Sequence, residues 1–398
     1  MSRSSLPPGP VGHAEKGPSS IKSQHGGRRL TRLLGALLLG VLIAAANATA
    51  AYSPSSRLCL RPLFSDRPRL QDVDKTGVLW LNLLLRQHEV CWRKPRSPNE
   101  TRIFALGNSA MYGFPWPSEL SAVGLVNRMF DRQNIPAHLF NLGFVFTYQV
   151  KEALILSEAL PYEPDFVVYG ATLDDFGHLA PFPYLPVTTF FNANSRAVAQ
   201  LASDPPPTFG EPFRKYRDAQ AENIRPYASW IAFRQTGTFV RLAVEQTAKM
   251  LRRKLFPAFR EANPQTHKRR ALYNCAEVKK SFSKKYANWK EWNMLEYLAI
   301  LRRETGMKVL VVNWPVAYEP RGDCYNVRYP TAALEDYVDW MGETTKRLGL
   351  EYLDLHDLLA RQDFVDSVHP TVGGQKKVAI RLAKQIATLL HKETISDD

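Results

Sequence analysis

The sequence predicts an α/β protein: a three-layer α/β/α sandwich on a mainly parallel sheet, carrying a large insertion. Two observations predict this class. After residue 100, short apolar runs alternate with segments of helical periodicity, the pattern of strands joined by crossover helices. Between about residues 174 and 292 the alternation stops, and proline-rich stretches and a run of basic residues follow. We interpret that stretch as the insertion.

Five short apolar runs are the candidate strands. They span residues 102–106, 137–142, 165–169, 308–314 and 352–355. Apolar residues at helical spacing predict the connecting helices. These helices span residues 117–132, 147–160, a segment through 334–348 that ends near Gly349, and 371 to about 391. Connections of this length favour parallel strands with helices on both faces of the sheet.

The residues before this domain predict export. Residues 1–27 are rich in Gly, Pro and Ser and poor in apolar residues, which predicts a disordered cytoplasmic tail. Arg28, Arg29 and Arg32 then precede the apolar run 33–46, and basic residues on this side keep the amino end in the cytoplasm. The rest of the chain is therefore expected outside the cytoplasm, in the periplasm or at the cell surface.

Residues 28–52 form either a transmembrane signal anchor or a cleaved signal peptide. The whole segment reaches about the 20 residues that span a bilayer. Its strongly apolar part is shorter, and Ala48-Thr49-Ala50 fits a signal-peptidase site. The long preceding tail favours the anchor. Residues 53–100 are then a linker and lead-in, and residues 101–392 are the α/β domain.

The four cysteines all follow the apolar segment, as expected in an oxidising compartment. Proximity in the sequence favours pairing Cys59 with Cys91 and Cys275 with Cys324, although unpaired buried thiols are an equal alternative. No Cys-x-x-Cys or His-rich spacing indicates a metal site. We expect neither a metal nor another cofactor.

The positive charge is concentrated in one segment. The chain carries a net charge of +14, and residues 249–290 hold thirteen Lys and Arg against two Glu, a local +11. Outside the cytoplasm such a segment fits anionic lipid headgroups or an acidic polysaccharide, and nucleic acid is not an expected partner there. The alternative is a solvated lysine-rich face without a ligand.

Two polar segments are expected to meet at the carboxyl edge of the sheet. Ser109, in Gly107-Asn108-Ser109, directly follows the first strand, and Asp366 and His369, in "DSVHPT", follow the last strand. Ligands bind at this edge of an open parallel sheet. A serine hydroxyl becomes a useful nucleophile when a histidine takes its proton and a carboxylate orients that histidine. The spacing therefore predicts a Ser–His–Asp site.

These segments resemble the first and last motif blocks of SGNH (GDSL-type) hydrolases: "FALGNSAMYG" resembles the first and "DSVHPTVGGQKKVAIRLAKQI" the last. The resemblance spans about residues 102–390. It implies the α/β/α sandwich, with Ser109 as nucleophile, His369 as general base and Asp366 as its orienting acid. It also implies that the N–H groups of Ser109 and Gly143 bind the oxyanion.

The third block departs from the family pattern. The family's Gly-x-Asn-Asp supplies an Asn side chain as an oxyanion donor, whereas "YGATLDD" places Thr172 or Leu173 there, depending on the alignment. A threonine hydroxyl can donate and a leucine cannot. Loss of one donor costs about 3 kcal/mol in the transition state. The chain is therefore a slow hydrolase, an acyltransferase that disfavours water, or no longer an enzyme.

Together, these features predict serine-dependent acyl-ester chemistry on a carbohydrate outside the cytoplasm, as an O-acetyl esterase or O-acyltransferase. They resemble the membrane-anchored bacterial SGNH proteins of polysaccharide and cell-wall O-acylation, which implies a multispanning membrane acyltransferase as a partner. A lipase or general carboxylesterase is the alternative within enzymes, with "YGFPWP" forming an acyl pocket. A non-catalytic glycan-binding scaffold is the alternative outside enzymes.

Overall fold

A five-stranded parallel sheet forms the centre of the domain, as the sequence predicts. The computed structural model describes residues 35, 38–40, 42, 85, 88–92, 99–144, 149–176 and 294–390. The strand order is β2-β1-β3-β4-β5, and every neighbouring pair is parallel. This is the flavodoxin-like order, in which the direction of winding reverses between β1 and β3 and a ligand crevice opens at their carboxyl ends.

The strands lie close to their predicted positions. They are β1 (Thr101–Gly107), β2 (Ala137–Asn141), β3 (Phe166–Ala171), β4 (Lys308–Asn313) and β5 (Glu351–Asp354). Each bound differs by at most two residues from the apolar run that predicted it. Strand β3 is buried along its whole length, because it is the middle strand and helices cover both of its faces.

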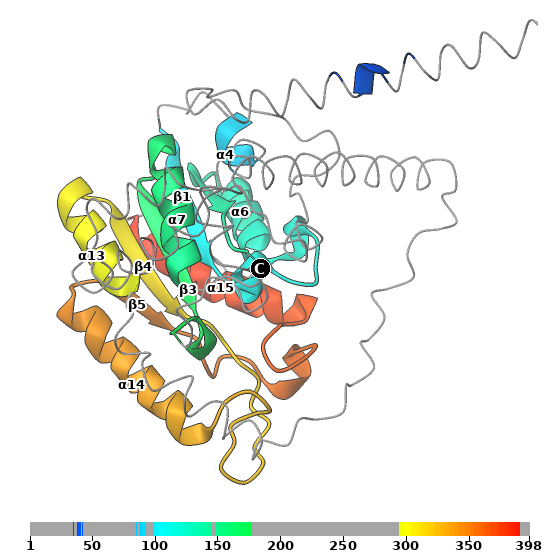
Figure 1. The fold of residues 1–398 in the computed structure, drawn as a ribbon, viewed down its shortest axis with the longest axis vertical. Coiled ribbons are helices and arrows are strands. Elements are labelled where there is room, and N and C mark those ends of the chain that lie inside the picture. The colour runs from blue at the N-terminus through cyan, green and yellow to red at the C-terminus, as the bar shows by residue number, and fades with distance from the viewer. Residues whose placement is uncertain are drawn as a thin grey trace, which may run out of the picture. The chain divides into compact units, whose positions relative to one another are not determined.

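Helices cover the two faces of the sheet in two groups (Figure 1). On one face, α6 (Ala122–Arg132) packs against α15 (Val372–Leu389). On the other lie α7 (Gln149–Ala159), α13 (Met294–Thr305) and α14 (Thr331–Arg347). Alternate residues of β1 serve the two layers: Phe104 and Leu106 pack with the second group, Ile103 and Ala105 with the first. The three-layer α/β/α prediction is confirmed.

One helix prediction needs correction, and one helix was not predicted. The helix predicted over residues 117–132 is two elements, a short 3-10 helix η1 (Ser118–Leu120) and then α6. They separate at Ser121, which has extended backbone angles and caps α6 through a hydrogen bond from the N–H of Gly124. Helix α13 was not predicted, because it follows the irregular stretch that we interpret as an insertion.

Several predictions fall mainly outside the described residues. These are the tail 1–27, the segment 28–52, most of the linker 53–100 and the insertion 174–292. In the described part of the chain, no helix has both the length and the apolarity to cross a membrane. The chain divides into two units, Met1–Ser56 and Arg57–Asp398, and the sheet belongs to the second.

Disulfide bonding is observed at both described cysteines. Cys91, in the short helix α4 (Glu89–Trp92), and Cys324 are each disulfide-bonded. This rules out the alternative of unpaired thiols for these two residues. Cys59 and Cys275 lie outside the described residues, so the proposed pairing stays a prediction.

The backbones of β1 and β3 come into close contact at their carboxyl ends. Gly107 pairs with Gly170, and Gly107 has φ = +149°. A Cβ atom on Gly107 would lie 2.4 Å from the carbonyl oxygen of Gly170 and 2.9 Å from the Cβ of Met111. Only glycine fits both this conformation and this space. The residues that follow the two strands are therefore held side by side.

We expect Gly107→Ala to destabilise the fold by about 3 kcal/mol, because it adds backbone strain and a clash with a neighbouring strand. Gly306→Ala is the matched control: Gly306 also has a positive φ, +72°, but a Cβ there meets no atom within 4 Å. It should cost only about 1 kcal/mol. Urea unfolding followed by tryptophan fluorescence measures both. Equal costs would show that the close contact of the strands does not constrain the fold.

Candidate active site

Ser109 lies at the carboxyl edge of the sheet, on the first turn after β1. It begins the one-turn helix α5 (Ser109–Tyr112), and Asn108 is its N-cap. The side-chain oxygen of Asn108 accepts a hydrogen bond from the N–H of Ala110 at 2.9 Å. Gly113 ends the turn with a left-handed backbone conformation. The serine is thus fixed on a tight turn, because Asn is a favoured residue at the start of a helix and Gly is a favoured residue at its end.

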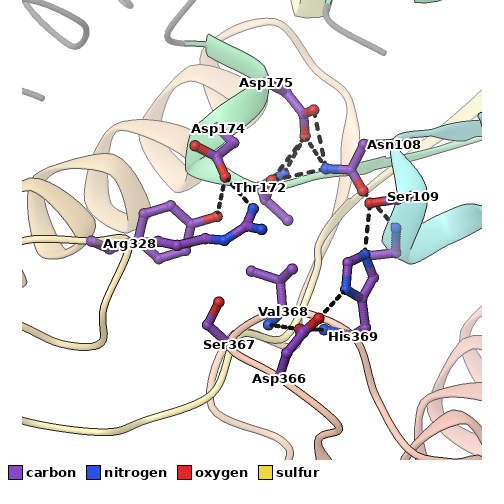
Figure 2. Close-up of polar contacts among 12 residues, drawn as sticks. Asn108, Ser109, Thr172, Asp174, Asp175, Arg328, Asp366, Ser367, Val368 and His369 are labelled. Carbon is purple, nitrogen blue, oxygen red and sulfur yellow. Dashed lines mark hydrogen bonds and ion pairs between the residues drawn. The ribbon is translucent and has the colours of Figure 1, made fainter. Parts of the chain in front are cut away.

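Ser109, His369 and Asp366 form a continuous hydrogen-bonded chain (Figure 2). Ser109 Oγ lies 2.8 Å from His369 Nε2, and His369 Nδ1 lies 2.7 Å from Asp366 Oδ2. With its Nδ1 proton donated to the carboxylate, the ring presents Nε2 as an acceptor for the serine proton. The three residues that the sequence singled out are therefore brought together in the geometry of a Ser–His–Asp triad.

The loop that carries Asp366 and His369 is fixed by its own backbone. Asp366 Oδ1 accepts hydrogen bonds from the N–H groups of Val368 and His369, both at 2.9 Å. The carbonyl of His369 accepts from the N–H of Val365 at 2.9 Å. Pro370 and the N-cap Thr371 then lead into α15. One carboxylate therefore orients the imidazole and shapes the loop that holds it.

The pKa of Asp366 lies well below its ordinary value. Burial alone would raise it, but the hydrogen bond and charge of His369 and the two backbone N–H groups stabilise the anion more strongly. The side chain thus remains an acceptor-only carboxylate across the physiological pH range. This is the form that orients an imidazole and stabilises its protonated state.

A second polar cluster lies behind Ser109. The Asn108 side-chain amide donates to Thr172 Oγ1 at 2.9 Å and to the two carboxylate oxygens of Asp175 at 3.1 and 2.9 Å (Figure 2). Asp175 also accepts from the N–H and the hydroxyl of Thr172, at 2.6 and 3.1 Å. Burial and the nearby charge of Glu152 raise the pKa of Asp175, against the hydrogen bonds from Thr172 and Asn108. This cluster fixes the turn that presents Ser109.

Two of the predicted oxyanion donors are already hydrogen-bonded within the protein. The Gly143 N–H donates to Asn141 Oδ1 at 3.0 Å. The single hydroxyl proton of Thr172 is donated to Asp175, and its oxygen accepts from Asn108. The third predicted donor is the N–H of Ser109, which has no hydrogen-bond acceptor among the described residues. Leu173 is buried and follows Thr172 into the short 3-10 helix η3 (Leu173–Phe176).

Aromatic side chains form one side of the site. The ring of Phe114 lies 5.0 Å from the His369 ring, centroid to centroid, in an edge-to-face arrangement. The indole N–H of Trp116 donates to the carbonyl of Pro370 at 2.8 Å. The segment "YGFPWP" is therefore attached to the loop that carries the histidine, and it gives this side of the site an apolar surface.

The structural role of Asn108 and Asp175, whose hydrogen bonds fix the turn that carries Ser109, was not predicted from the sequence. Asn108 was part of the Gly-Asn-Ser motif, but its amide contacts are with residues more than sixty positions later in the chain. A signal for Asp175 existed: a carboxylate four residues after an apolar central strand needs hydrogen-bond donors when it is buried. Nothing in the sequence specified that Asn108 supplies one of them.

Within the described ranges, no cluster of three or more His, Cys, Asp or Glu side chains has the arrangement of a metal site.

Comparison with known proteins finds similarity at the level of solved structures. No protein-family model and no curated protein sequence matches the chain. Solved structures to which it is similar include a lipase/acylhydrolase from Enterococcus faecalis, at 12% identity and a TM-score of 0.35, covering 73% of this chain and 96% of that one. A carbohydrate acetylesterase family member from Sinorhizobium meliloti matches at 12% identity and a TM-score of 0.35, covering 73% and 99%.

These similarities show neither the family of this chain nor a membrane anchor. At such low identities and TM-scores, the interpretation of the site depends on its own geometry. That geometry defines a class: an α/β/α protein with a Ser–His–Asp site at the carboxyl edge of its parallel sheet.

We expect a fluorophosphonate probe to label Ser109, because the hydrogen bond to His369 activates its hydroxyl. Asp366→Asn should slow labelling by a factor on the order of 10³ to 10⁴, since an amide fixes the wrong imidazole tautomer. Ser118→Ala is the control, because Ser118 is a partly exposed serine of η1. Peptide mass spectrometry locates the label. Labelling at another serine, or equal rates for wild type and Asp366→Asn, would contradict the triad.

The lowered pKa of Asp366 also predicts a pH dependence of stability. An acid with a folded-state pKa below its unfolded value stabilises the fold at pH values above the unfolded pKa of about 3.9. That contribution disappears as the pH falls through the folded-state pKa. The difference in unfolding free energy between wild type and Asp366→Asn should thus stay constant at neutral pH and shrink on acidification below about pH 4. Urea unfolding at several pH values tests this, and a difference that grows on acidification would contradict it.

Proposed function

We propose that this protein carries out serine-dependent acyl-ester chemistry, as an O-acetyl esterase or O-acyltransferase acting on a carbohydrate. The observation that carries the proposal is the hydrogen-bonded chain from Ser109 through His369 to Asp366, with steps of 2.8 and 2.7 Å. It lies at the edge of the sheet where ligands bind in this topology. Asp366 keeps its charge there, which suits the role of orienting acid.

The first half-reaction forms an acyl-serine. Ser109 Oγ attacks the ester carbonyl while His369 Nε2 takes the hydroxyl proton, and Asp366 stabilises the resulting imidazolium. The tetrahedral intermediate breaks down when the bond to the leaving alcohol cleaves and His369 returns the proton to that alcohol. In the second half-reaction His369 deprotonates water or a sugar hydroxyl, and that oxygen attacks the acyl carbonyl. The bond to Ser109 Oγ then cleaves and His369 returns the proton to Ser109, so that water gives hydrolysis and a sugar gives transfer.

The oxyanion of the intermediate requires donors that the protein does not already use. The N–H of Ser109 is the donor that this geometry supports best, since it has no acceptor among the described residues. Gly143 and Thr172 were predicted as further donors, but their protons bind Asn141 and Asp175. Each missing donor costs about two to three decades in rate. We therefore propose a slow enzyme, for which a well-bound sugar hydroxyl competes effectively with water.

The proposed setting is extracytoplasmic and membrane-attached. The disulfide bonds at Cys91 and Cys324 support an oxidising compartment. The described residues of the apolar segment include helical positions, and Leu38, Leu39 and Leu42 each expose more than half of their surface. We propose that residues 28–52 form the anchor, on the basis of the apolar run and the arginines that precede it. A multispanning membrane acyltransferase is the proposed source of the acyl group.

A lipase or general carboxylesterase is the second candidate, and one observation favours it. Phe114 and Trp116 form an apolar side of the site next to His369, which suits an acyl chain. A non-catalytic glycan-binding scaffold is the third candidate. It does not require a serine, a histidine and a carboxylate in hydrogen-bonding geometry.

The test uses the purified full-length chain with three substrates: p-nitrophenyl acetate, p-nitrophenyl decanoate and acetylated xylan. We expect acetate release from p-nitrophenyl acetate and xylan that falls by a factor on the order of 10³ or more in Ser109→Ala. Added sugar acceptors should divert acetyl groups from water if transfer dominates. A strong preference for decanoate would favour the lipase. If wild type and Ser109→Ala are equally inactive on all three, the hydrolase proposal fails.

A further inference from the structure

Arg328 lies in the segment between β4 and α14, on the side of the site opposite Ser109. Figure 2 shows its guanidinium group pointing into the space between Thr172 and Val368, toward the triad. The side chain is 44% exposed. None of the steps proposed for the acyl-ester reaction uses this cation.

Two sets of contacts hold Arg328 in place relative to the triad. On one side, Arg328 Nη1 donates to Asp174 Oδ2 at 3.2 Å, and Asp174 is adjacent in sequence to Asp175, which binds Asn108. On the other, the backbone N–H of Arg328 donates to Asn326 Oδ1 at 2.8 Å, and the Asn326 amide donates to the Ala317 carbonyl at 2.8 Å.

The second set of contacts continues to the histidine loop. The N–H of Ala317 donates to the carbonyl of Ser367 at 3.0 Å, and Ser367 lies between Asp366 and His369. Asn326 is buried, as is Tyr329, whose hydroxyl donates to Asp174 Oδ2 at 2.9 Å. These contacts connect Arg328 to the turn of Ser109 through Asp174 and to the loop of His369 through Asn326 and Ala317. The cation is therefore fixed within the same site.

Among the described residues, the ion pair with Asp174 leaves most of the guanidinium N–H groups without an acceptor. A guanidinium has five N–H donors, and one terminal nitrogen contacts one carboxylate oxygen, without the two parallel bonds of a bidentate pair. The side chain of Asp174 is 18% exposed, against 44% for Arg328. Arg328 is therefore more accessible to solvent and to a substrate than Asp174 is.

The electrostatics agree with this placement. Burial acts to lower the pKa of Arg328, but the charges of Asp174 and Asp366 raise it above the ordinary value. The effect of Asp366 is expected for a guanidinium that shares the site with the triad carboxylate. The side chain is thus a permanent cation whose planar group suits a carboxylate or a sulfate.

We propose that Arg328 binds an anionic substituent of the carbohydrate substrate, so that the protein acts on esters of uronic acids or of sulfated sugars. This inference rests on the proposed function, and it names the substrate class of that same site. Binding by the guanidinium would hold the sugar with its ester facing Ser109. The same anion could orient an acceptor sugar for transfer.

The first experiment compares matched sugars with the full-length chain. The probes are 3-O-acetyl methyl galactosiduronate, the 3-O-acetyl methyl galactoside with a neutral 6-hydroxyl, and its 6-sulfate. We expect wild type to prefer the anionic probes in kcat/KM by about 10- to 100-fold, the range for hydrogen bonds to a charged group. The uronate and sulfate arms distinguish the two sources of the anion.

Arg328→Gln should reduce that preference to near unity, and Arg328→Lys should restore part of it, because lysine keeps the charge without the planar fork. The matched control is Arg347→Gln. Arg347 is at the end of α14, next to the amino end of β5, and its side chain is 62% exposed beside Glu296. Losing it changes the net charge equally and should leave the preference intact. Equal losses on all three probes in Arg328→Gln, or no preference in wild type, would overturn the proposal.

A binding measurement separates this proposal from the proposed function. Titration calorimetry of oligogalacturonate against Ser109→Ala, with and without Arg328→Gln, does not depend on turnover. If no probe is hydrolysed but binding is lost on changing Arg328, the proposed enzyme fails and anion binding stands. If esterase activity is present but binding is unaffected by Arg328→Gln, the enzyme stands and the role of Arg328 fails.

Discussion

The close contact of β1 and β3 at Gly107 and Gly170 is the constraint on which the site depends. Parallel pairing directs the carboxyl ends of all five strands to one edge, and the absence of a side chain at Gly107 lets its backbone lie against the carbonyl oxygen of Gly170 there. Asn108 and Thr172 follow the two strands directly, and their side chains meet at 2.9 Å. A larger residue at Gly107 would separate the elements that present Ser109.

The position of Ser109 in the triad depends on the close contact at Gly107, and the position of His369 depends on the local turn shaped by Asp366. Ser109 and His369 are 260 residues apart, and their hydrogen bond joins the first strand to the loop before the last helix. Asp366 shapes that loop through backbone N–H groups and orients the imidazole with its other oxygen. Both ends of the serine–histidine contact are therefore held by hydrogen bonds to the backbone.

The fold was predictable because its elements carry strong local signals. Strands β1 to β4 are mainly apolar runs of ordinary length, whereas β5 is short and carries two charged residues. Helices α6, α14 and α15 each have one apolar face. The three triad residues were also predictable, since Ser109 directly follows the first strand and Asp366 and His369 directly precede the last helix. Helix α13 was missed because it follows a long stretch without periodicity. The split at Ser121 was missed because a capping serine inside an otherwise helical pattern gives a weak signal.

The finer features of the site depend on one long-range contact and two short-range ones. Asn108 binds Asp175 across 67 positions of the chain, whereas Thr172 gives its proton to Asp175 three residues later and Gly143 donates to Asn141 two residues earlier. The sequence identified Thr172 and Gly143 as donors by their place in the motifs. Only the structure shows that both of these protons already have acceptors within the protein, so the set of oxyanion donors could not be predicted from the motifs.

The most direct test of the account is the detection of the acyl-serine. The full-length chain is mixed with p-nitrophenyl acetate, quenched in acid at short times and digested for mass spectrometry. We expect one acetyl group on the peptide that contains Ser109, appearing before steady-state turnover is reached. Turnover without acetylation of Ser109, or acetylation of another residue at the same rate, would contradict the central claim that Ser109 is the nucleophile.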